Sequence, residues 1–474
     1  MPELPEVETV RATLEHQIVG EKITDVIVRY NGIISPMAED DFKRALINQT
    51  IRKMDRYGKH LIFILDNCSM LSHLRMEGKY FLKSADDEII KHEHIIFKFA
   101  SGRELRYHDT RKFGRMKIIP STDKEIIMKD PTLAKLGVEG NNPNLNYLDL
   151  FNKLQGLKEP IKTALLDQSI ICGLGNIYVD EVCFKSRINP TTPAYLITKY
   201  DVKNIVKYSK IILDEAILAG GTTIRSYTSS LGVTGLFQQE LFVHTKVGEP
   251  CQICGSIIEK TRVGGRGTYF CPNCQKPHPV IVGITGGIGT GKSSVSKHIK
   301  ELGYELIDTD LISKELTNSD EVLKEIKDVF GDEYLINGKL NRTLMGKLVF
   351  SDYNSRTKLN NIIHTKVLKE VVNKINNSIN NLIFIDVPLL FEAHFDELCH
   401  KIICVDLDLN NNIDRLMKRD NINKDMAKMK INSQMPLIEK KNKSDFIIDN
   451  SKELCYTYKQ LEDIINQIKS RYKL

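Results

Sequence analysis

The segment Gly286–Ser293 has the sequence Gly-Gly-Ile-Gly-Thr-Gly-Lys-Ser, which matches the G-x-x-x-x-G-K-[ST] pattern of a phosphate-binding loop. Such a loop joins a strand to a helix. The apolar run 280–284 predicts the strand, and Val295 and Ile299 recur at helical spacing after the loop. A phosphate-binding loop usually follows the first strand of its domain, yet residues 1–279 precede this one. The chain therefore reads as two proteins joined end to end.

Length and composition are those of a multidomain globular protein. A chain of 474 residues is too long for one hydrophobic core and predicts about three domains. No apolar run approaches the ~18 residues of a membrane span, and the acidic N-terminus lacks the features of a signal peptide. We therefore expect a cytoplasmic protein that does not contact a membrane. The net charge of +6 is weak evidence for a nucleic-acid partner, because a solvated surface explains it equally well.

The order of strand and helix signals divides the chain. Short runs rich in β-branched and aromatic residues crowd residues 23–120 and predict a β-sandwich or barrel. These runs are 26–28, 60–65, 79–82, 94–99 and 117–119. Residues 129–219 have helical periodicity. From residue 280 onward strands alternate with helices, which predicts a parallel α/β sheet.

Four of the ten cysteines form a C-x2-C-x16-C-x2-C pattern, which fits one structural, tetrahedral zinc ion; a redox role is the alternative. These are Cys251, Cys254, Cys271 and Cys274. So small a unit cannot bury a core of its own, so the metal would stabilise it. Between the cysteine pairs, Arg266 lies in a glycine-rich turn whose backbone can approach a phosphate closely. The alternative is a basic turn without a binding role.

The N-terminus carries a candidate nucleophile. If Met1 is removed, Pro2 becomes a secondary amine, and an α-amino group titrates near pH ~8, well below the ~10.4 of a lysine. A neutral amine can attack carbonyl-like carbon and form an iminium, and the adjacent Glu3 can serve as general acid. The alternative is an ordinary helix start.

Several separated motifs in residues 1–276 resemble those of bacterial formamidopyrimidine-DNA glycosylase, a DNA-repair enzyme. They are the start Met1–Thr9, the segments Asp109–Gly114 and Gly173–Glu181, and the zinc hairpin with Arg266. Leu4 stands where the related endonuclease VIII group usually has glycine. The resemblance implies a catalytic β-sandwich in residues 1–125, a helix-two-turn-helix DNA-binding domain in 126–240 and a zinc finger in 241–276. Residues 277–279 would then be a linker.

The resemblance also implies a reaction on double-stranded DNA that contains oxidised purines or abasic sites. Pro2 would displace the damaged base and form a Schiff base, Glu3 would protonate the opening sugar, and Lys59 and Arg266 would assist β- and δ-elimination. The remaining matches are proposed DNA contacts, namely His73, Met76, His92, Arg111, Phe113, Lys158 and Asn176. A surface residue is the alternative for His92, and core packing for Met76.

Other positions concern the fit to this family. The segment 220–227 resembles the loop that closes over the flipped base. Thr110 and Cys172 depart from the family pattern, which usually has proline and a small apolar residue there.

The phosphate-binding loop leaves GTPase, motor and kinase functions open. Its nucleotide-binding residues would be Gly286, Gly287, Gly289, Thr290, Gly291, Lys292, Ser293 and Ser294. Lys292 would reach the β- and γ-phosphates, and Ser293 would hold the Mg²⁺ that accompanies ATP. Asp310 follows the predicted strand 304–307, where a carboxylate can accept a proton from an attacking hydroxyl or can simply cap a helix. Arg415 and Arg419 lie four residues apart on one face of a predicted helix. They can stabilise the charge that develops on a transferred phosphoryl group, or they can simply form a solvated basic face.

Residues 280–474 resemble dephospho-CoA kinase. The resemblance lies in the phosphate-binding loop and in the segments 307–310, 386–392, 415–420 and 445–450, together with Gln434. It implies that ATP phosphorylates the ribose 3′-hydroxyl of dephospho-CoA. Asp310 would then act as base, and Lys292, Arg415 and Arg419 would stabilise charge. Asn412, Lys430 and Thr365 depart from the usual Gln, Arg and Pro.

The sequence therefore predicts a fused, monomeric, bacterial two-enzyme chain that holds one zinc ion and uses Mg²⁺ with ATP. One alternative is a DNA-damage binding protein whose binding is regulated by ATP. Another is a glycosylase fused to a different nucleoside or nucleotide kinase.

Overall fold

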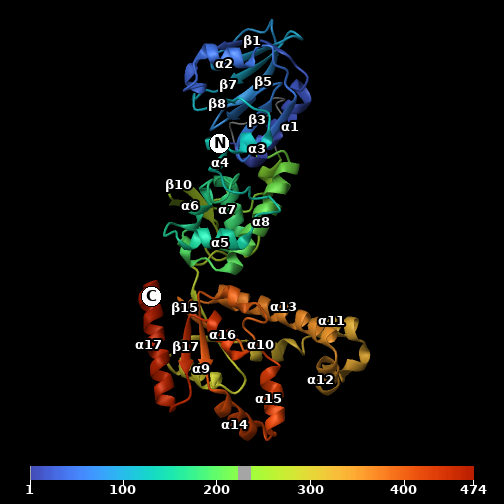
Figure 1. The fold of residues 1–474 in the computed structure, drawn as a ribbon, viewed down its shortest axis with the longest axis vertical. Helices are drawn as coiled ribbons and strands as arrows, with labels where there is room; N and C mark the ends of the chain where they lie inside the picture. The colour runs from blue at the N-terminus through green and yellow to red at the C-terminus, as the bar shows by residue number, and fades with distance from the viewer. Residues whose placement is uncertain (1, 223–235) are drawn as a thin grey trace. The chain divides into compact units, whose positions relative to one another are not determined.

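The structure is a computed structural model that describes residues 2–222 and 236–474 (Figure 1). It divides into two compact units, Met1–Lys276 and Pro277–Leu474. Within the described residues, no helix has both the length and the apolar character needed to cross a membrane.

The first unit begins with α1 (Leu4–Ile18), followed by a sandwich of two antiparallel four-stranded sheets, as predicted. One sheet has the order β1 (Ile23–Val28), β6 (Glu93–Phe99), β7 (Arg103–His108) and β5 (Lys79–Ser84). The other has the order β2 (Lys53–Tyr57), β3 (His60–Ile64), β4 (Ser69–His73) and β8 (Arg115–Ile119). Apolar residues of both sheets, such as Phe63 and Phe97, pack in one core with Leu14 of α1 and Phe42 of α2 (Glu39–Leu46). The short helix η1 (Asn31–Ile33) precedes α2.

The helical part of the first unit has a separate core. Its elements are α3 (Lys124–Met128), α4 (Pro131–Ala134), α5 (Tyr147–Gln155), α6 (Ile161–Leu166), α7 (Asn176–Lys185), η2 (Ala194–Leu196), α8 (Lys199–Leu218) and η3 (Phe237–Glu240). The predicted stripe of α8, including Ile205, Ile212 and Ala216, is buried in this core. Leu4 belongs to this core although the rest of α1 packs on the sandwich, so the start of the chain lies where the two cores meet. A hairpin of β9 (Glu259–Val263) and β10 (Arg266–Phe270) completes the unit.

The second unit contains the predicted parallel sheet, with five strands (Figure 1). Their order is β12 (Glu305–Asp308), β15 (Leu382–Asp386), β11 (Val280–Gly286), β16 (Lys401–Asp406) and β17 (Phe446–Asp449). Val295 of α9 (Lys292–Glu301) and Ile465 of α17 (Leu454–Tyr472) pack in one core with Val282 and Ile284 of the central strand. The strand predicted at 304–307 lies one residue later, because Asp308 ends it and caps the next helix.

The other elements of the second unit flank this sheet. They are α10 (Thr309–Leu316), α11 (Asp320–Phe330), η4 (Asp332–Tyr334), β13 (Leu335–Ile336), β14 (Lys339–Leu340), α12 (Arg342–Ser351), α13 (Tyr353–Asn377), η5 (Phe395–Leu398), α14 (Leu409–Asp420), α15 (Lys424–Asn432) and α16 (Leu437–Lys443). Helix α13 runs unbroken through Thr365, whose Oγ1 donates to the carbonyl of Asn361 at 2.7 Å. Threonine keeps the backbone N–H that a proline at this position would remove.

Candidate active sites

The start of the chain is buried against the loop that precedes α7. Pro2 and Glu3 are both buried. The N–H of Leu4 donates to the carbonyl of Gly173 at 3.1 Å, and the N–H of Ile177 donates to Glu3 Oε1 at 3.0 Å. Glu3 Oε2 is buried and has no hydrogen-bond partner in the described part of the chain. One carboxylate oxygen is thus fixed, and the other has no partner among residues 2–222 and 236–474 and is available to a ligand.

Glu6 holds this terminus in place and was missed as a site residue. Its Oε2 accepts the N–H of Glu3 at 2.8 Å, which completes a capping box. Its Oε1 accepts the hydroxyl of Tyr178 at 2.6 Å and the N–H of Thr222 at 2.8 Å. The signal was present in the sequence, because a glutamate three residues after a helix cap often reaches back to it. Of the segment 220–227, residues 223–227 lie outside the described residues.

Lys59 contacts the same segment as Glu3, residues 173–177 at the start of α7. It occupies the two-residue turn between β2 and β3, is buried, and donates from Nζ to the carbonyl of Leu174 at 2.6 Å. Burial lowers the pKa of Lys59, while the charge of Glu3 opposes that shift. Burial raises the pKa of Glu3, and Lys59 opposes it in turn. Both shifts favour the neutral forms, a carboxylic acid and an amine, which are the forms that proton transfer needs.

Arg266 is held near this site by the hairpin. Gly264 and Gly265 both have left-handed φ angles, +54° and +75°, as a tight two-residue turn requires. Arg266 follows the turn, is exposed, and is close enough to contribute to lowering the pKa of Lys59. Asn176 Nδ2 donates to the carbonyl of Gly267 at 3.0 Å and ties the hairpin to α7.

An exposed loop presents two of the predicted DNA contacts together. The guanidinium of Arg111 lies 4.8 Å from the ring centre of Phe113, whose side chain is 46% exposed. The buried carboxylate of Asp109 fixes the loop by accepting the N–H groups of Arg111 at 3.0 Å and Gly114 at 2.8 Å. The apolar ring of Phe113 and the guanidinium donors of Arg111 therefore project from the same turn.

The other predicted contacts are more dispersed. Lys158 is exposed, and Met76 and His92 are half-buried. His73 is half-buried and packs edge-on against His60 at 4.5 Å between ring centres. Burial, and then the neighbouring His60, lower the pKa of His73 to about 2, so its ring is neutral.

The four predicted zinc ligands converge. Their Sγ atoms all lie within 4.8 Å of one another, with Cys251 and Cys274 at 3.8 Å and Cys254 and Cys271 at 3.5 Å. Tetrahedral zinc with Zn–S bonds of ~2.3 Å places its sulfurs about 3.8 Å apart. The donor set and its spacing therefore fit zinc.

In the second unit, Lys292 of the phosphate-binding loop forms an ion pair with Asp386. Asp386 also accepts the hydroxyl of Ser296 at 2.6 Å and ends β15, next to the strand that leads into the loop. Asp386 was not predicted as a site residue. The rule that pointed to Asp310, a carboxylate at the carboxyl end of a parallel strand, applies equally to Asp386.

Asp310 lies in the first turn of α10, facing the same cluster. Partial burial raises its pKa; Lys292 opposes that shift, and Asp308 and Asp386 add to it. The helix cap itself is Asp308, whose Oδ1 accepts the N–H of Asp310 at 3.0 Å. Asp310 is therefore free of the capping role that was the alternative for it.

The two predicted arginines differ in position. Arg415 donates to the carbonyl of Asn450 at 3.1 Å, and Asn450 Nδ2 donates to the carbonyl of Thr290 in the phosphate-binding loop at 2.7 Å. Arg419 instead bonds Asp420 at 2.7 Å, and Lys430 bonds the same carboxylate. The structure thus brings Arg415 to the loop but pairs Arg419 within its own helix.

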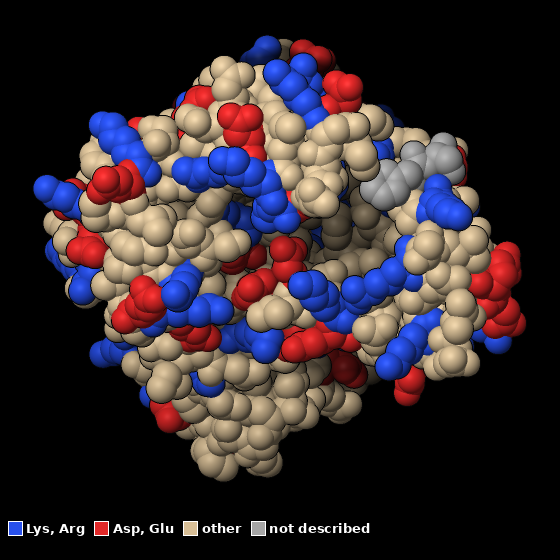
Figure 2. Space-filling view, turned by 90° about the horizontal axis from the view of Figure 1, so that it is seen from below, with Lys and Arg blue, Asp and Glu red and all other residues tan. Residues whose placement is uncertain are grey.

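A pocket of about 890 Å³ lies beside this loop, at the carboxyl ends of β16 and β17. Gly287, Asn412, Gln434 and Asp449 are among its lining residues. Figure 2 views the molecule from the side of α14 and α15 and shows a hollow with basic side chains around it and acidic side chains within it. The pocket volume is in the range of small-molecule and cofactor sites.

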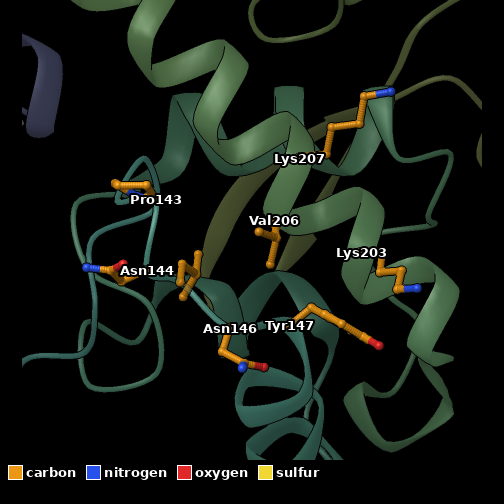
Figure 3. A pocket seen from close by; sticks show the side chains of 8 residues that line it. Pro143, Asn144, Asn146, Tyr147, Lys203, Val206 and Lys207 are labelled. Carbon is orange, nitrogen blue, oxygen red and sulfur yellow. The ribbon is translucent and has the colours of Figure 1, made fainter.

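A second, open pocket of about 460 Å³ lies between the loop 143–147 and α8 (Figure 3). Lys203 lies over the ring of Tyr147, 4.7 Å from its centre. Asn146 already accepts the N–H groups of Leu148 and Asp149, so the start of α5 is capped and offers less to an anion. We assign no site to this pocket.

Known protein families match both units. The N-terminal domain of formamidopyrimidine-DNA glycosylase matches residues 1–116, its H2TH domain 136–228, and the zinc finger found in FPG and IleRS 248–277. Dephospho-CoA kinase matches residues 280–455.

Whole relatives match the first unit. The formamidopyrimidine-DNA glycosylase of Listeria innocua is 45% identical over 276 residues, which are 58% of this chain and 100% of the relative. That of Bacillus licheniformis is 48% identical over 279 residues and is also covered completely. A solved complex of Lactococcus lactis Fpg with abasic-site DNA has 42% identity and a TM-score of 0.54, and covers 58% of this chain and 100% of that one.

Fold, site and matches define a zinc-finger DNA glycosylase joined to a phosphate-loop kinase. The chain belongs to the formamidopyrimidine-DNA glycosylase family through its first unit and carries a dephospho-CoA kinase domain in its second. Both resemblances noted in the sequence are thus confirmed, as are the fold class and the zinc finger.

Proposed function

We propose that the first unit excises oxidised purines, such as 8-oxoguanine and formamidopyrimidines, through a Schiff base on Pro2. The supporting observation is the buried start of the chain: Pro2 is buried, and its neighbour Glu3 and Lys59 both contact residues 173–177. The Pro2 nitrogen bonds to the sugar C1′ as the bond from C1′ to the base breaks, and the proton that this nitrogen loses is taken up by the departing base. The sugar ring then opens as its C1′–O4′ bond breaks, the iminium forms, and Glu3 gives its proton to O4′.

The neutral amine of Lys59 then takes a proton from C2′, and the 3′-phosphate leaves in β-elimination. Arg266 binds phosphate and assists the second, δ-elimination. Arg111, Phe113 and Met76 fill the space of the flipped base, and His73, His92, Lys158 and Asn176 hold the DNA backbone. Structures of Lactococcus lactis Fpg contain abasic-site DNA and Fapy-dG DNA, and we extend this substrate class to the first unit.

The second unit transfers the γ-phosphoryl group of ATP to the 3′-hydroxyl of dephospho-CoA. The raised pKa of Asp310 supports its role as the base that accepts the hydroxyl proton. Lys292 leaves Asp386 to bind phosphate, with backbone N–H groups of Gly286–Ser294 around it. Ser293 and Asp386 offer oxygen ligands for Mg²⁺, which supplies charge neutralisation when bound. Arg415 neutralises charge on the transferred group, and Arg419 joins it after leaving Asp420.

The first activity is tested by incubating the full chain, with Met1 removed, with a duplex containing one 8-oxoguanine opposite cytosine. We expect release of the base and cleavage of the damaged strand, and neither on an undamaged duplex. Binding to the lesion without base release would instead support a DNA-damage binding protein.

The second activity is tested by ATP consumption with dephospho-CoA or nucleosides as acceptors. We expect consumption with dephospho-CoA only, and its loss in Lys292→Ala, while the same preparation keeps its glycosylase activity as an internal control. Preference for a nucleoside would assign the second unit to another kinase specificity.

A further inference from the structure

The turn that contains Lys59 packs against the thiol of Cys172. Cys172 is fully buried, and a Cβ added to Gly58 would lie 2.3 Å from its Sγ. The next nearest atom, Cδ1 of Leu136, is 3.6 Å away, so the thiol alone occupies this space. Gly58 has a φ of +57° and is the first residue of the turn, with Lys59 as the second.

The backbone on both sides of this contact is fixed. The N–H of Cys172 donates to the carbonyl of Val138 at 2.9 Å, and its carbonyl accepts the N–H of Gly140 at 2.9 Å. On the other side, the N–H of Gly58 donates to Glu139 Oε1 at 2.7 Å. The thiol therefore lies between two segments that are both anchored to residues 138–140.

The segment that contains Cys172 also contacts the proposed catalytic residues. Two residues on, the carbonyl of Leu174 accepts the Nζ of Lys59, and Gly173 accepts the N–H of Leu4 beside Glu3. Burial raises the pKa of Cys172 to about 12, so the group next to Lys59 is a neutral thiol that acts by its size.

We propose that Cys172 is a positioning residue for Lys59: its Sγ, packed against Gly58, sets where the Lys59 amine lies relative to Pro2 and Glu3. The inference rests on the proposed glycosylase function and adds a residue to it. Because a misplacement of about 1 Å can cost ~10²-fold in rate, a change in the size of either partner alters the Lys59 step more than DNA binding.

The test measures single-turnover β-elimination on an abasic-site duplex with full-length chains. We expect Gly58→Ala to slow elimination about tenfold or more, and Cys172→Ala added to it to restore at least threefold, because the alanine methyl group then meets no sulfur. Restoration below threefold would overturn the inference, since it would leave only the backbone strain of alanine at a left-handed φ.

A second variant separates positioning from folding. Cys172→Leu overfills the space and partly frees Lys59 from burial, so the pH limb of elimination that Lys59 controls moves to higher pH; Cys172→Ser leaves it in place. An unchanged limb in Cys172→Leu contradicts the inference. Melting temperature and kinase activity of the same chains report folding, and borohydride trapping reports the Schiff base. If the wild-type chain itself fails to trap DNA, the proposed function fails rather than this inference.

Discussion

The N–H of Ile177 donates to Glu3 Oε1 at 3.0 Å. The other carboxylate oxygen of Glu3, Oε2, is buried and has no hydrogen-bond partner in the described residues. A buried, unpaired oxygen is costly unless it is protonated or meets a ligand. Burial of this carboxyl group raises the pKa of Glu3, which favours the protonated form.

Glu3→Gln is expected to slow base excision by about 10²–10⁴-fold, because glutamine can still accept the N–H of Ile177 but cannot donate as an acid. Duplex affinity, measured by anisotropy, should stay within about twofold of wild type, since no DNA contact is removed. A variant that excises at the wild-type rate would remove Glu3 from the reaction.

The pH dependence of the melting temperature of Glu3→Gln tests whether the pKa of Glu3 is raised in the folded protein. The folded state binds this proton more tightly than the unfolded chain, so its stabilising contribution is present below the ordinary pKa of 4.5 and is lost as pH rises through the raised value. Glu3→Gln should therefore melt higher than wild type near pH 8 and show no such advantage near pH 4. Equal pH dependence of the two melting temperatures would contradict the raised pKa.

Arg111→Ala should reduce the preference for cytosine opposite the lesion by about tenfold to a hundredfold, the ~1–3 kcal/mol of a bidentate base contact. Lys112→Ala is the matched control, because Lys112 is the exposed neighbour and lies over the ring of Tyr30 instead. Excision rates with each of the four opposing bases give the measurement. Equal loss of preference in both variants would indicate a general charge effect.

Removal of zinc by a chelator should weaken DNA binding at least about tenfold, because the four cysteines hold the hairpin that presents Arg266. Dephospho-CoA phosphorylation by the same molecules should not change. Zinc content and both activities can be followed in one titration. Loss of both activities together would mean that the whole chain unfolds.

Asp386→Asn should lower the kinase rate about 10²–10³-fold, since it removes the charge that partners Lys292 and that we assign to Mg²⁺. Asp352→Asn is a suitable control, because that carboxylate only caps α13. Initial rates at saturating ATP and dephospho-CoA distinguish the two. A wild-type rate in Asp386→Asn would exclude it from the site.

The sequence predicted the sandwich strands that contain an apolar or aromatic run, but it missed β2, β4 and β7. In β4 only the two apolar residues Met70 and Leu71 stand between serines, and β2 and β7 are rich in charged residues. Strand β7 was not predicted because charged residues occupy three of its first four positions. Its Arg106 is fully buried, where it pairs with Glu93 and Glu104 and donates to backbone carbonyls. The pairing with Glu93 joins β7 to β6, so no local pattern reports it. Strand β2 was missed for a similar reason, as its Arg56 pairs with Glu8 and Glu139.

The site residues also fall into those that a local motif predicts and those that only the fold brings together. Motifs pointed to Pro2, Glu3, Lys59 and the phosphate-binding loop, but the contact of Lys59 with Leu174 spans 115 residues and needed the fold. The roles of these residues, and of the departures at Asn412 and Lys430, stay predictions until they are measured.

The central claim is that one chain carries a glycosylase whose nucleophile is Pro2. The most direct measurement is borohydride reduction of the full-length chain on an 8-oxoguanine duplex, followed by mass spectrometry of the cross-linked peptide. We expect a covalent complex that contains all 474 residues except Met1, with the sugar attached to the nitrogen of Pro2. A cross-link at Lys59, or no cross-link on a chain with a free Pro2, would contradict it.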